Sequence, residues 1–160
     1  SSLTGHLVMS TVHTNSAAGA ITRLRDMGIE SFLLASSLKT IISQRLIRRL
    51  CNKCKSESKV SQVAIDLLGL KKGQTVFSAK GCNDCDGTGF KGRIAIAESI
   101  QVGSVLKDMI HDEASEQDIQ NVAFKDIQTI DQIGSELLTK GLTSPEELIR
   151  INNQKEDASV

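Results

Sequence analysis

The sequence is poor in aromatic residues: among its 160 residues there is no tryptophan or tyrosine, and there are only four phenylalanines. The core must therefore be packed from Ile, Leu, Val and Ala, and stacking platforms for single-stranded nucleic acid are not expected. The chain also has no net charge, because its 19 basic residues balance its 19 acidic residues. This balance argues against a nucleic acid as partner of the whole domain. No stretch approaches the ~20 apolar residues of a membrane span.

The common catalytic loops are also missing. The sequence has no phosphate loop of the form G-x-x-x-x-G-K-[ST] and no G-x-S-x-G elbow. Gly87, Gly89 and Gly92 have the spacing of a dinucleotide-binding loop, but they follow a cysteine pair rather than a strand, so we interpret them as a turn. The acidic residues are scattered over predicted helix surfaces. We therefore expect no self-contained active site in this chain.

All four cysteines occur in two Cys-x-x-Cys pairs, Cys51–Cys54 and Cys82–Cys85. A two-residue spacer lets both thiolates of a pair bind one ion, and two pairs complete the tetrahedral four-thiolate shell of structural zinc. Disulfides in a secreted domain and a redox pair are the alternatives. No secretory segment is recognisable, and no βαβ pattern precedes either pair. We therefore predict structural Zn²⁺ at Cys51, Cys54, Cys82 and Cys85, in a reduced cytoplasmic setting.

The first 50 residues predict one strand and two helices. Residues 6–13 are apolar on both faces, which favours a buried parallel strand. A helix is expected from Ala17 to Met27, after good N-cap residues and before Gly28 as its C′ residue. A second helix is expected over residues 31–50. Its apolar stripe consists of Leu34, Leu38, Ile41, Ile42 and Leu46.

The remaining chain predicts a metal-binding excursion followed by helices. Between the cysteine pairs we expect a loop with one short helix at residues 63–70, and residues 93–100 alternate as a strand that returns to the core. Ser144 and Pro145 mark a helix start. The further helices are expected at residues 103–111, 115–123, 130–140 and 144–152.

Two histidines bracket the predicted strand. Seven residues at about 3.3 Å each would separate His6 from His13 by about 23 Å, so the two cannot act together. His13 follows the strand at the end where ligands collect in open α/β sheets, which makes it a candidate functional residue, with a structural role as the alternative. Arg45, Arg48 and Arg49 crowd the end of the second expected helix. There they either complement the helix dipole or form an anion site.

Five stretches occur in an order that is typical of one family. They are Thr4–Asn15 with its two histidines, Arg23–Ile29, Gln44–Cys51, the second cysteine pair through Arg93 and Glu98, and Thr143–Arg150. Together they resemble the secretion traffic ATPases, the E-proteins of type II secretion and of type IV pilus assembly. The resemblance covers nearly the whole chain, and Thr4–Asn15 matches the family's histidine box. The four cysteines point to the secretion and pilus-assembly branch rather than the retraction branch.

The resemblance implies an α/β fold, namely the C-terminal part of a RecA-like core with a zinc subdomain and a C-terminal helical region. The family's phosphate loop and acidic boxes lie upstream of the histidine box, so we expect a C-terminal fragment that is inactive alone. The full-length protein would bind ATP and Mg²⁺. The expected segments are 1–50 (end of the core, with the histidine-box strand and two helices), 51–93 (zinc subdomain), 94–152 (returning strand and helical region) and 153–160 (flexible tail).

The resemblance also assigns residues and partners. His13 would lie near the γ-phosphate and couple the nucleotide state to domain arrangement, with His6 as the second histidine of the box. Arg45 would lie near nucleotide or a neighbouring subunit. The full-length protein is expected to be a cytoplasmic homo-hexamer, held at the inner membrane by the platform and cytoplasmic-domain proteins of its machine.

Two other functions fit single features of the sequence. Residues 82–89 spell the Cys-x-x-Cys-x-Gly-x-Gly repeat of J-domain co-chaperones, which would make the chain a zinc module for protein binding. The first cysteine pair lacks those glycines. Alternatively, the basic residues around Cys51 suit a zinc-ribbon nucleic-acid binder, although acidic residues balance them over the domain. The order of motifs favours the ATPase.

Overall fold

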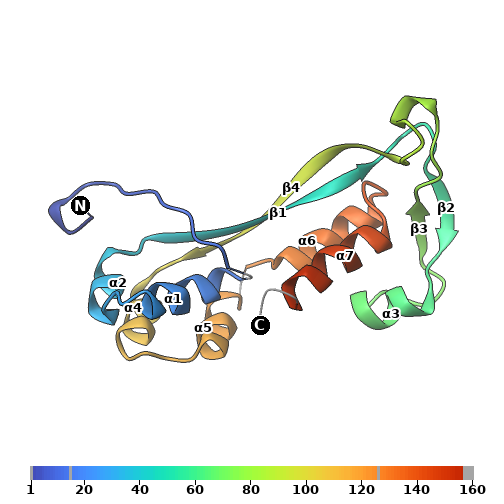
Figure 1. Ribbon diagram of the computed structural model, residues 1–160. Coiled ribbons are helices and arrows are strands. Elements are labelled where there is room, and N and C mark those ends of the chain that lie inside the picture. Colours follow the sequence, from blue (N-terminus) through green and yellow to red (C-terminus); the bar gives the residue numbers. More distant parts are fainter. Residues whose placement is uncertain (1, 15, 126, 157–160) are drawn as a thin grey trace. The chain divides into compact units, whose positions relative to one another are not determined.

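The structure is a computed structural model that describes residues 2–14, 16–125 and 127–156. The chain divides into two compact units: unit 1 is Ser1–Ser43 with Glu98–Gln128, and unit 2 is Gln44–Ala97 with Thr129–Val160. Each unit is built from two separate stretches of the chain. Strands β1 (Thr40–Leu50) and β4 (Phe90–Gln101) each begin in one unit and end in the other (Figure 1).

Unit 1 is mainly helical. After a 3₁₀ turn, η1 (Ser2–Thr4), its helices are α1 (Ala17–Asp26), α2 (Ser31–Ser37), α4 (Ser104–His111) and α5 (Glu116–Ala123). Their shared core includes the fully buried side chains of Ile21, Ile100, Ile110 and Ile119. Helices α4 and α5 confirm two of the helices expected from the sequence.

Helix α1 begins and ends as the sequence predicts. Ser16 Oγ accepts a hydrogen bond from Gly19 N at 2.8 Å, which caps the first turn. Gly28 follows the helix with a φ of 85°, a conformation that favours glycine. Ile29 N donates to Leu24 O at 3.2 Å, which completes a Schellman motif.

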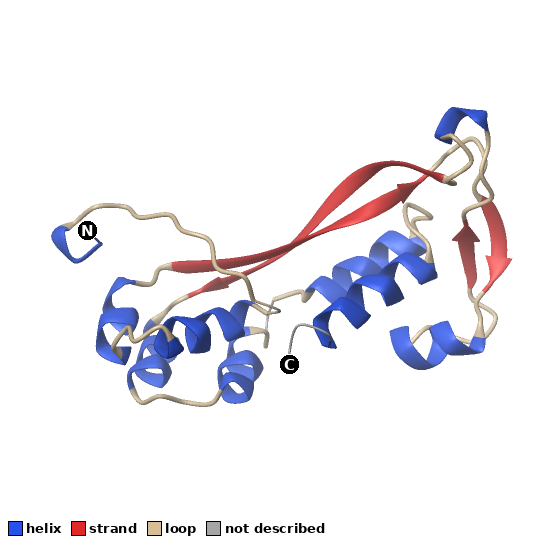
Figure 2. Ribbon diagram, viewed as in Figure 1, coloured by secondary structure: helices blue, strands red, loops and turns tan. Residues whose placement is uncertain are grey.

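The strand predicted over residues 6–13 is wrong for this structure. These residues form exposed coil, drawn in tan in Figure 2, and the side chains of Leu7 and Met9 are 88% and 90% exposed. A strand needs a neighbour that pairs with its backbone N–H and C=O groups. Among the described residues, the paired strands are β1 with β4 and β2 with β3, so residues 6–13 have no such neighbour.

The second predicted helix is wrong beyond its first two turns. Helix α2 ends at Ser37, and residues 40–50 form β1. Three consecutive residues at its start, Thr40, Ile41 and Ile42, are β-branched and favour an extended backbone. Lys39 O accepts from Val102 N at one end and Gly89 O accepts from Cys51 N at the other, both at 2.9 Å. β1 and β4 are therefore antiparallel.

Unit 2 surrounds its own apolar core with a hairpin and three helices. Strands β2 (Ser56–Lys59) and β3 (Thr75–Ser78) pair in antiparallel register, a hairpin that the sequence did not predict. The helix expected between them is present as α3 (Gln62–Leu68). Helices α6 (Ile130–Thr139) and α7 (Pro145–Glu156) confirm the last two predicted helices. The core consists of Ile47, Ala64, Leu70, Val76, Ile96, Ile130, Leu138, Leu148 and Ile151.

Two further expectations concern the chain's ends and membranes. Helix α7 continues to Glu156, so the flexible tail expected from residue 153 is helical at its start, and residues 157–160 lie outside the described part. Of the helices in the described residues, none is long and apolar enough to cross a membrane.

Candidate metal centre

The four cysteine sulfurs lie within 4.8 Å of one another in unit 2. Cys85 Sγ is 3.7 Å from both Cys54 Sγ and Cys82 Sγ, and Cys51 Sγ is 3.9 Å from Cys82 Sγ. A tetrahedral zinc ion with Zn–S bonds of about 2.3 Å requires sulfurs about 3.8 Å apart. The cluster therefore has the dimensions of a four-thiolate metal shell, and none of the four cysteines forms a disulfide.

Local backbone geometry shapes each cysteine pair. In the first pair, Lys55 N donates to Cys51 O at 2.9 Å and turns the chain around the sulfurs. The second pair forms a 3₁₀ turn, η2 (Asn83–Cys85), and the chain leaves it through Gly87 and Gly89, whose φ values are 75° and 76°. Non-glycine residues rarely adopt such values. The glycines that follow Cys85 are therefore required by the turn, as the sequence indicated.

The thiols of Cys54 and Cys85 differ in acidity. Burial raises the pKa of the Cys54 thiol to about 12. Burial also disfavours the Cys85 thiolate, but the backbone N–H groups of Cys82 and Gly89 donate to its sulfur at 3.3 and 3.2 Å and bring its pKa down to about 7. Cys85 is thus the more readily ionised of these two ligands, and a bound metal would displace the proton of Cys54.

An ion-pair bridge joins the two cysteine pairs. Asp84 accepts from Lys53 Nζ and from Lys91 Nζ, each at 2.8 Å. Lys53 and Asp84 occupy the same third position in their Cys-x-x-Cys pairs. The bonds from Lys53 and Lys91 hold the pKa of the Asp84 carboxyl at about 2. Because Zn²⁺ with four thiolates carries a net charge of about −2, the two lysines also offset the charge of an occupied centre.

The first cysteine pair is attached to the turn between α6 and α7. Leu50, next to Cys51, donates its N–H to Leu142 O at 2.9 Å. Lys55, next to Cys54, donates from Nζ to Gly141 O at 2.8 Å. A metal that fixes this cysteine pair would therefore also fix the α6–α7 turn.

A buried carboxylate lies at the start of α7. The side chain of Glu147 is fully buried and accepts from Arg48 N at 2.9 Å, Arg48 Nε at 2.8 Å and Arg150 Nη2 at 2.8 Å. Burial raises its pKa, but the two guanidinium groups outweigh burial and lower the pKa to about 2. Arg48 also lies over the Phe90 ring, 4.1 Å from its centroid. No spacing pattern in the sequence predicted this network; its signal was Glu147 within the family-like motif Thr143–Arg150.

The other predicted site residues lie in exposed or half-exposed positions. His6 and His13 are exposed in the coil of residues 6–13, and His6 Nδ1 lies 3.1 Å from Thr4 Oγ1. Arg45 is half-buried on β1. Arg45, Arg48 and Arg49 therefore do not follow a helix, and the helix-dipole interpretation of these residues is wrong.

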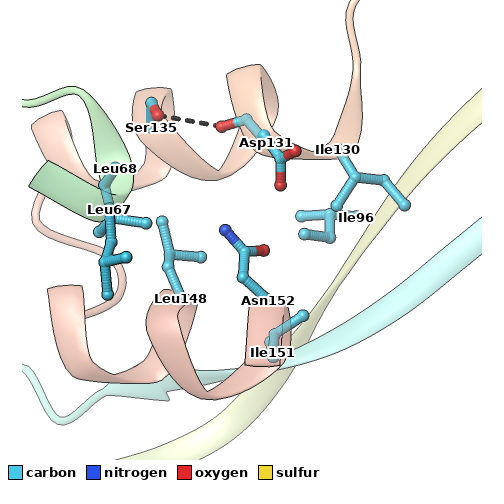
Figure 3. Close-up of a pocket in the computed structure, with 9 residues that line it drawn as sticks. All are labelled: Leu67, Leu68, Ile96, Ile130, Asp131, Ser135, Leu148, Ile151 and Asn152. Atoms are coloured by element: carbon cyan, nitrogen blue, oxygen red, sulfur yellow. Dashed lines mark hydrogen bonds between the residues drawn. The ribbon is translucent and has the colours of Figure 1, made fainter. Parts of the chain in front are cut away.

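Unit 2 also contains a small cavity between α3, α6, α7 and β4 (Figure 3). Its volume is about 130 Å³, and its wall combines leucine and isoleucine side chains with the polar residues Asp131, Ser135 and Asn152. The hydrogen bond at its rim joins Ser135 Oγ to Asp131 O at 2.9 Å. Ligand pockets usually measure about 300–1,000 Å³, so this cavity is too small for a nucleotide. Its lining residues are Leu67, Leu68, Ile96, Ile130, Asp131, Ser135, Leu148, Ile151 and Asn152.

The fold and the cysteine cluster define a chain of mixed helices and strands with four cysteines placed so that they could hold a metal ion. The model of the type II/IV secretion system protein family matches residues 1–150, and the chain belongs to this family. This match confirms the family resemblance inferred from the motifs.

Known relatives agree with the family match. The chain is 43% identical over 155 residues to the type II secretion system ATPase E of Vibrio cholerae, and 42% identical over 156 residues to type II secretion system protein E of Pseudomonas aeruginosa. It is 40% identical over 152 residues to the type IV pilus assembly ATPase PilB of Thermus thermophilus. These alignments cover 96%, 96% and 92% of this chain, but only 31%, 31% and 17% of the three relatives.

Proposed function

We propose that this chain is the C-terminal part of a hexameric ATPase that powers type II protein secretion or type IV pilus assembly. The family match over residues 1–150 carries this proposal. It is supported by relatives named as a secretion ATPase and a pilus assembly ATPase, each aligned with more than nine-tenths of the chain. The RecA-like core, the homo-hexamer and attachment to the inner membrane through platform proteins belong to the same proposal.

In this proposal the metal centre is structural. Four thiolates close the coordination shell of zinc and leave no position for a reacting water. Leu50 and Lys55 donate hydrogen bonds to the α6–α7 turn, so the metal centre is connected to helices α6 and α7. Zinc would thus rigidify unit 2, while ATP and Mg²⁺ are held by residues upstream of this chain.

His13 is the residue through which this chain would contact the nucleotide. It precedes Ser16, the N-cap of α1, by three residues, and the apolar residues before it are exposed here. In the full-length protein, residues 6–13 would find strand neighbours and bury Leu7 and Met9. His13 would then stand at the edge of that sheet near the γ-phosphate, with His6 and Arg45 in secondary roles.

The test is the ATPase rate of the full-length protein with His13→Ala. We expect turnover to fall at least about tenfold, because positioned side chains that act in the transition state of such reactions contribute about 10²-fold or more. His111→Ala is the matched control, because His111 is also exposed and its side-chain hydrogen bond among the described residues is to the neighbouring Asp112. Thermal unfolding of both variants should match the wild type. Unchanged turnover in His13→Ala would refute the assigned role.

A further inference from the structure

The charges of this chain are segregated although its net charge is zero. Residues 44–97 contain eleven basic and four acidic residues, a net charge of +7, and all other residues together contain eight basic and fifteen acidic ones, a net charge of −7. A four-thiolate zinc centre would lower the first value to about +5. The balanced total therefore conceals a basic and an acidic region.

The basic region has six exposed cations without an ion pair to any described residue, whereas Arg48, Lys53 and Lys91 are held by Glu147 and Asp84. We call these six the basic surface: Arg49, Lys59, Lys71, Lys72, Lys80 and Arg93. Lys71 and Lys72 lie in the loop that enters β3, and Lys59 at the end of β2 faces Thr75 at the start of β3. These three lysines thus share one end of the hairpin.

Five exposed carboxylates gather around the connection between α4 and α5 in unit 1. They are here called the acidic surface: Asp108, Asp112, Glu113, Glu116 and Asp118. Within the described part of the chain, none of them pairs with a lysine or arginine. The side-chain partners of the last four are His111, Ser31, Ser16 and Ser115, in that order.

Local helix stability does not explain the whole acidic surface. Glu116 and Asp118 lie in the first turn of α5, where carboxylates suit the helix dipole. Asp108 and Asp112 instead lie at the C-terminal end of α4, where the dipole disfavours negative charge. Glu113 in addition adopts a φ of 57°, which is strained for a residue with a side chain. Asp108, Asp112 and Glu113 therefore lower the local stability of the helix end and the turn. Because helix stability does not account for them, we infer that they serve to bind a cationic partner.

The acidic surface is also held in place. Ser31 Oγ donates to Glu113 Oε1 at 3.1 Å, and Ser16 Oγ donates to Glu116 Oε1 at 2.7 Å. Arg25 Nη2 donates to Ala114 O at 3.2 Å, which ties the connection between the helices to α1. A surface that is already ordered loses little conformational entropy when a partner binds.

We propose that the acidic surface of one copy docks on the basic surface of a second copy. The two surfaces are of similar size and opposite charge, with six cations on one and five carboxylates on the other, and a contact between two different patches on identical chains can close into a ring. Nucleic acid is a poorer occupant, because Phe77 and Phe90 already lie against Lys55 and Arg48 and cannot stack on bases. The inference rests on the homo-hexamer of the proposed function and names one of its contacts.

Sedimentation of the zinc-loaded 160-residue chain tests the contact. We expect association that rises with protein concentration and weakens from 50 to 500 mM NaCl. Asp112→Lys with Glu113→Lys, and separately Lys71→Glu with Lys72→Glu, should each weaken self-association at least about tenfold. Mixing the two variants should restore association, because the intact basic surface of the first variant can bind the intact acidic surface of the second. Glu146→Lys is the control, since it changes charge in the same direction as Asp112→Lys but lies in the first turn of α7, outside both surfaces.

Several outcomes would overturn the proposal. A wild-type chain that stays monomeric at low salt and high concentration refutes it, as does association that is insensitive to both charge reversals. Binding of duplex DNA or of anionic phospholipid vesicles that depends on Lys71 and Lys72, without self-association, would assign the basic surface to a different partner. The two proposals can fail separately. If this chain associates in a salt-sensitive way but the full-length protein does not hydrolyse ATP, the contact between the two surfaces is supported and the proposed ATPase function is refuted.

Discussion

Replacement of Glu147 by glutamine should destabilise unit 2 by about 2–3 kcal/mol. A carboxyl pKa lowered from 4.5 to about 2 corresponds to about 3 kcal/mol of stability at neutral pH. Solvent screening at Arg48 and Arg150, whose side chains are 46% and 44% exposed, reduces this to about 2 kcal/mol. The new amide adds a cost, because its NH₂ group must face guanidinium donors and leaves part of the buried network unsatisfied.

Urea unfolding of the zinc-saturated chain, followed by helical circular dichroism, measures this loss. Glu146→Gln is a matched control: the residue is adjacent and exposed and lies in the same helical turn, and its replacement removes the same charge. We expect the control to stay within about 0.5 kcal/mol of the wild type. Equal midpoints for Glu147→Gln and Glu146→Gln would refute the stabilising role of the buried carboxylate.

The pH dependence gives a second measurement of the same group. Because the folded pKa of Glu147 lies below its unfolded value, its contribution is complete above about pH 4.5 and is lost as pH falls towards 2. The difference in unfolding free energy between the wild type and Glu147→Gln should therefore shrink over this interval. Acid also releases metal from thiolates, but this affects both proteins alike and cancels in the difference.

Three further predictions follow from the metal centre, a turn and the sequence motifs. Elemental analysis should find about one zinc per chain, and Cys85→Ser should abolish tight retention; a metal-free but fully folded wild type would contradict the site. Gly141→Ala should cost about 2–3 kcal/mol in urea unfolding, because a Cβ at this φ of 63° would meet Phe77 Cδ2 at 2.6 Å. Gly69→Ala, with the same φ but open space, should cost only about 1 kcal/mol, and equal losses would rule out the clash. The isolated chain should not hydrolyse ATP in a phosphate-release assay, and robust hydrolysis would show that the catalytic groups are misplaced.

Local signals made much of the chain predictable. The spacing of the four cysteines indicated a cluster that the structure brings together, because a two-residue spacer limits where each pair of sulfurs can lie. Helix α1 was predictable from its cap and its C′ glycine, and α7 from Ser144 and Pro145. In each case the information lies within a few residues of the element that it determines.

The wrong predictions concern segments whose conformation depends on distant partners. Residues 40–50 have an apolar stripe compatible with a helix, but pairing with residues 90–101 makes them a strand. Residues 6–13 have the composition of a buried strand, and the described residues offer no strand to pair with them. Periodicity reports which side chains are apolar and not which backbone lies alongside.

Long-range polar contacts were equally beyond the sequence. Arg48 and Glu147 are 99 residues apart, and neither belongs to a spacing pattern that would indicate a pair. Lys53 and Asp84 are 31 residues apart and were visible only as parts of the cysteine pairs. The net charge of zero gave no sign of the separate basic and acidic surfaces, because a net charge does not say where in the fold the charged residues lie.

The division of both strands between the units has a consequence for biosynthesis. Each unit is built from an early and a late stretch, so neither can be completed while only the first half of this chain has been made. The cysteine cluster can form earlier in translation than the buried ion pair. Cys51 and Cys82 are 31 residues apart in the sequence, whereas Arg48 and Glu147 are 99 residues apart. During translation, a metal ion could thus anchor the growing polypeptide before the helices that later pack beside it exist.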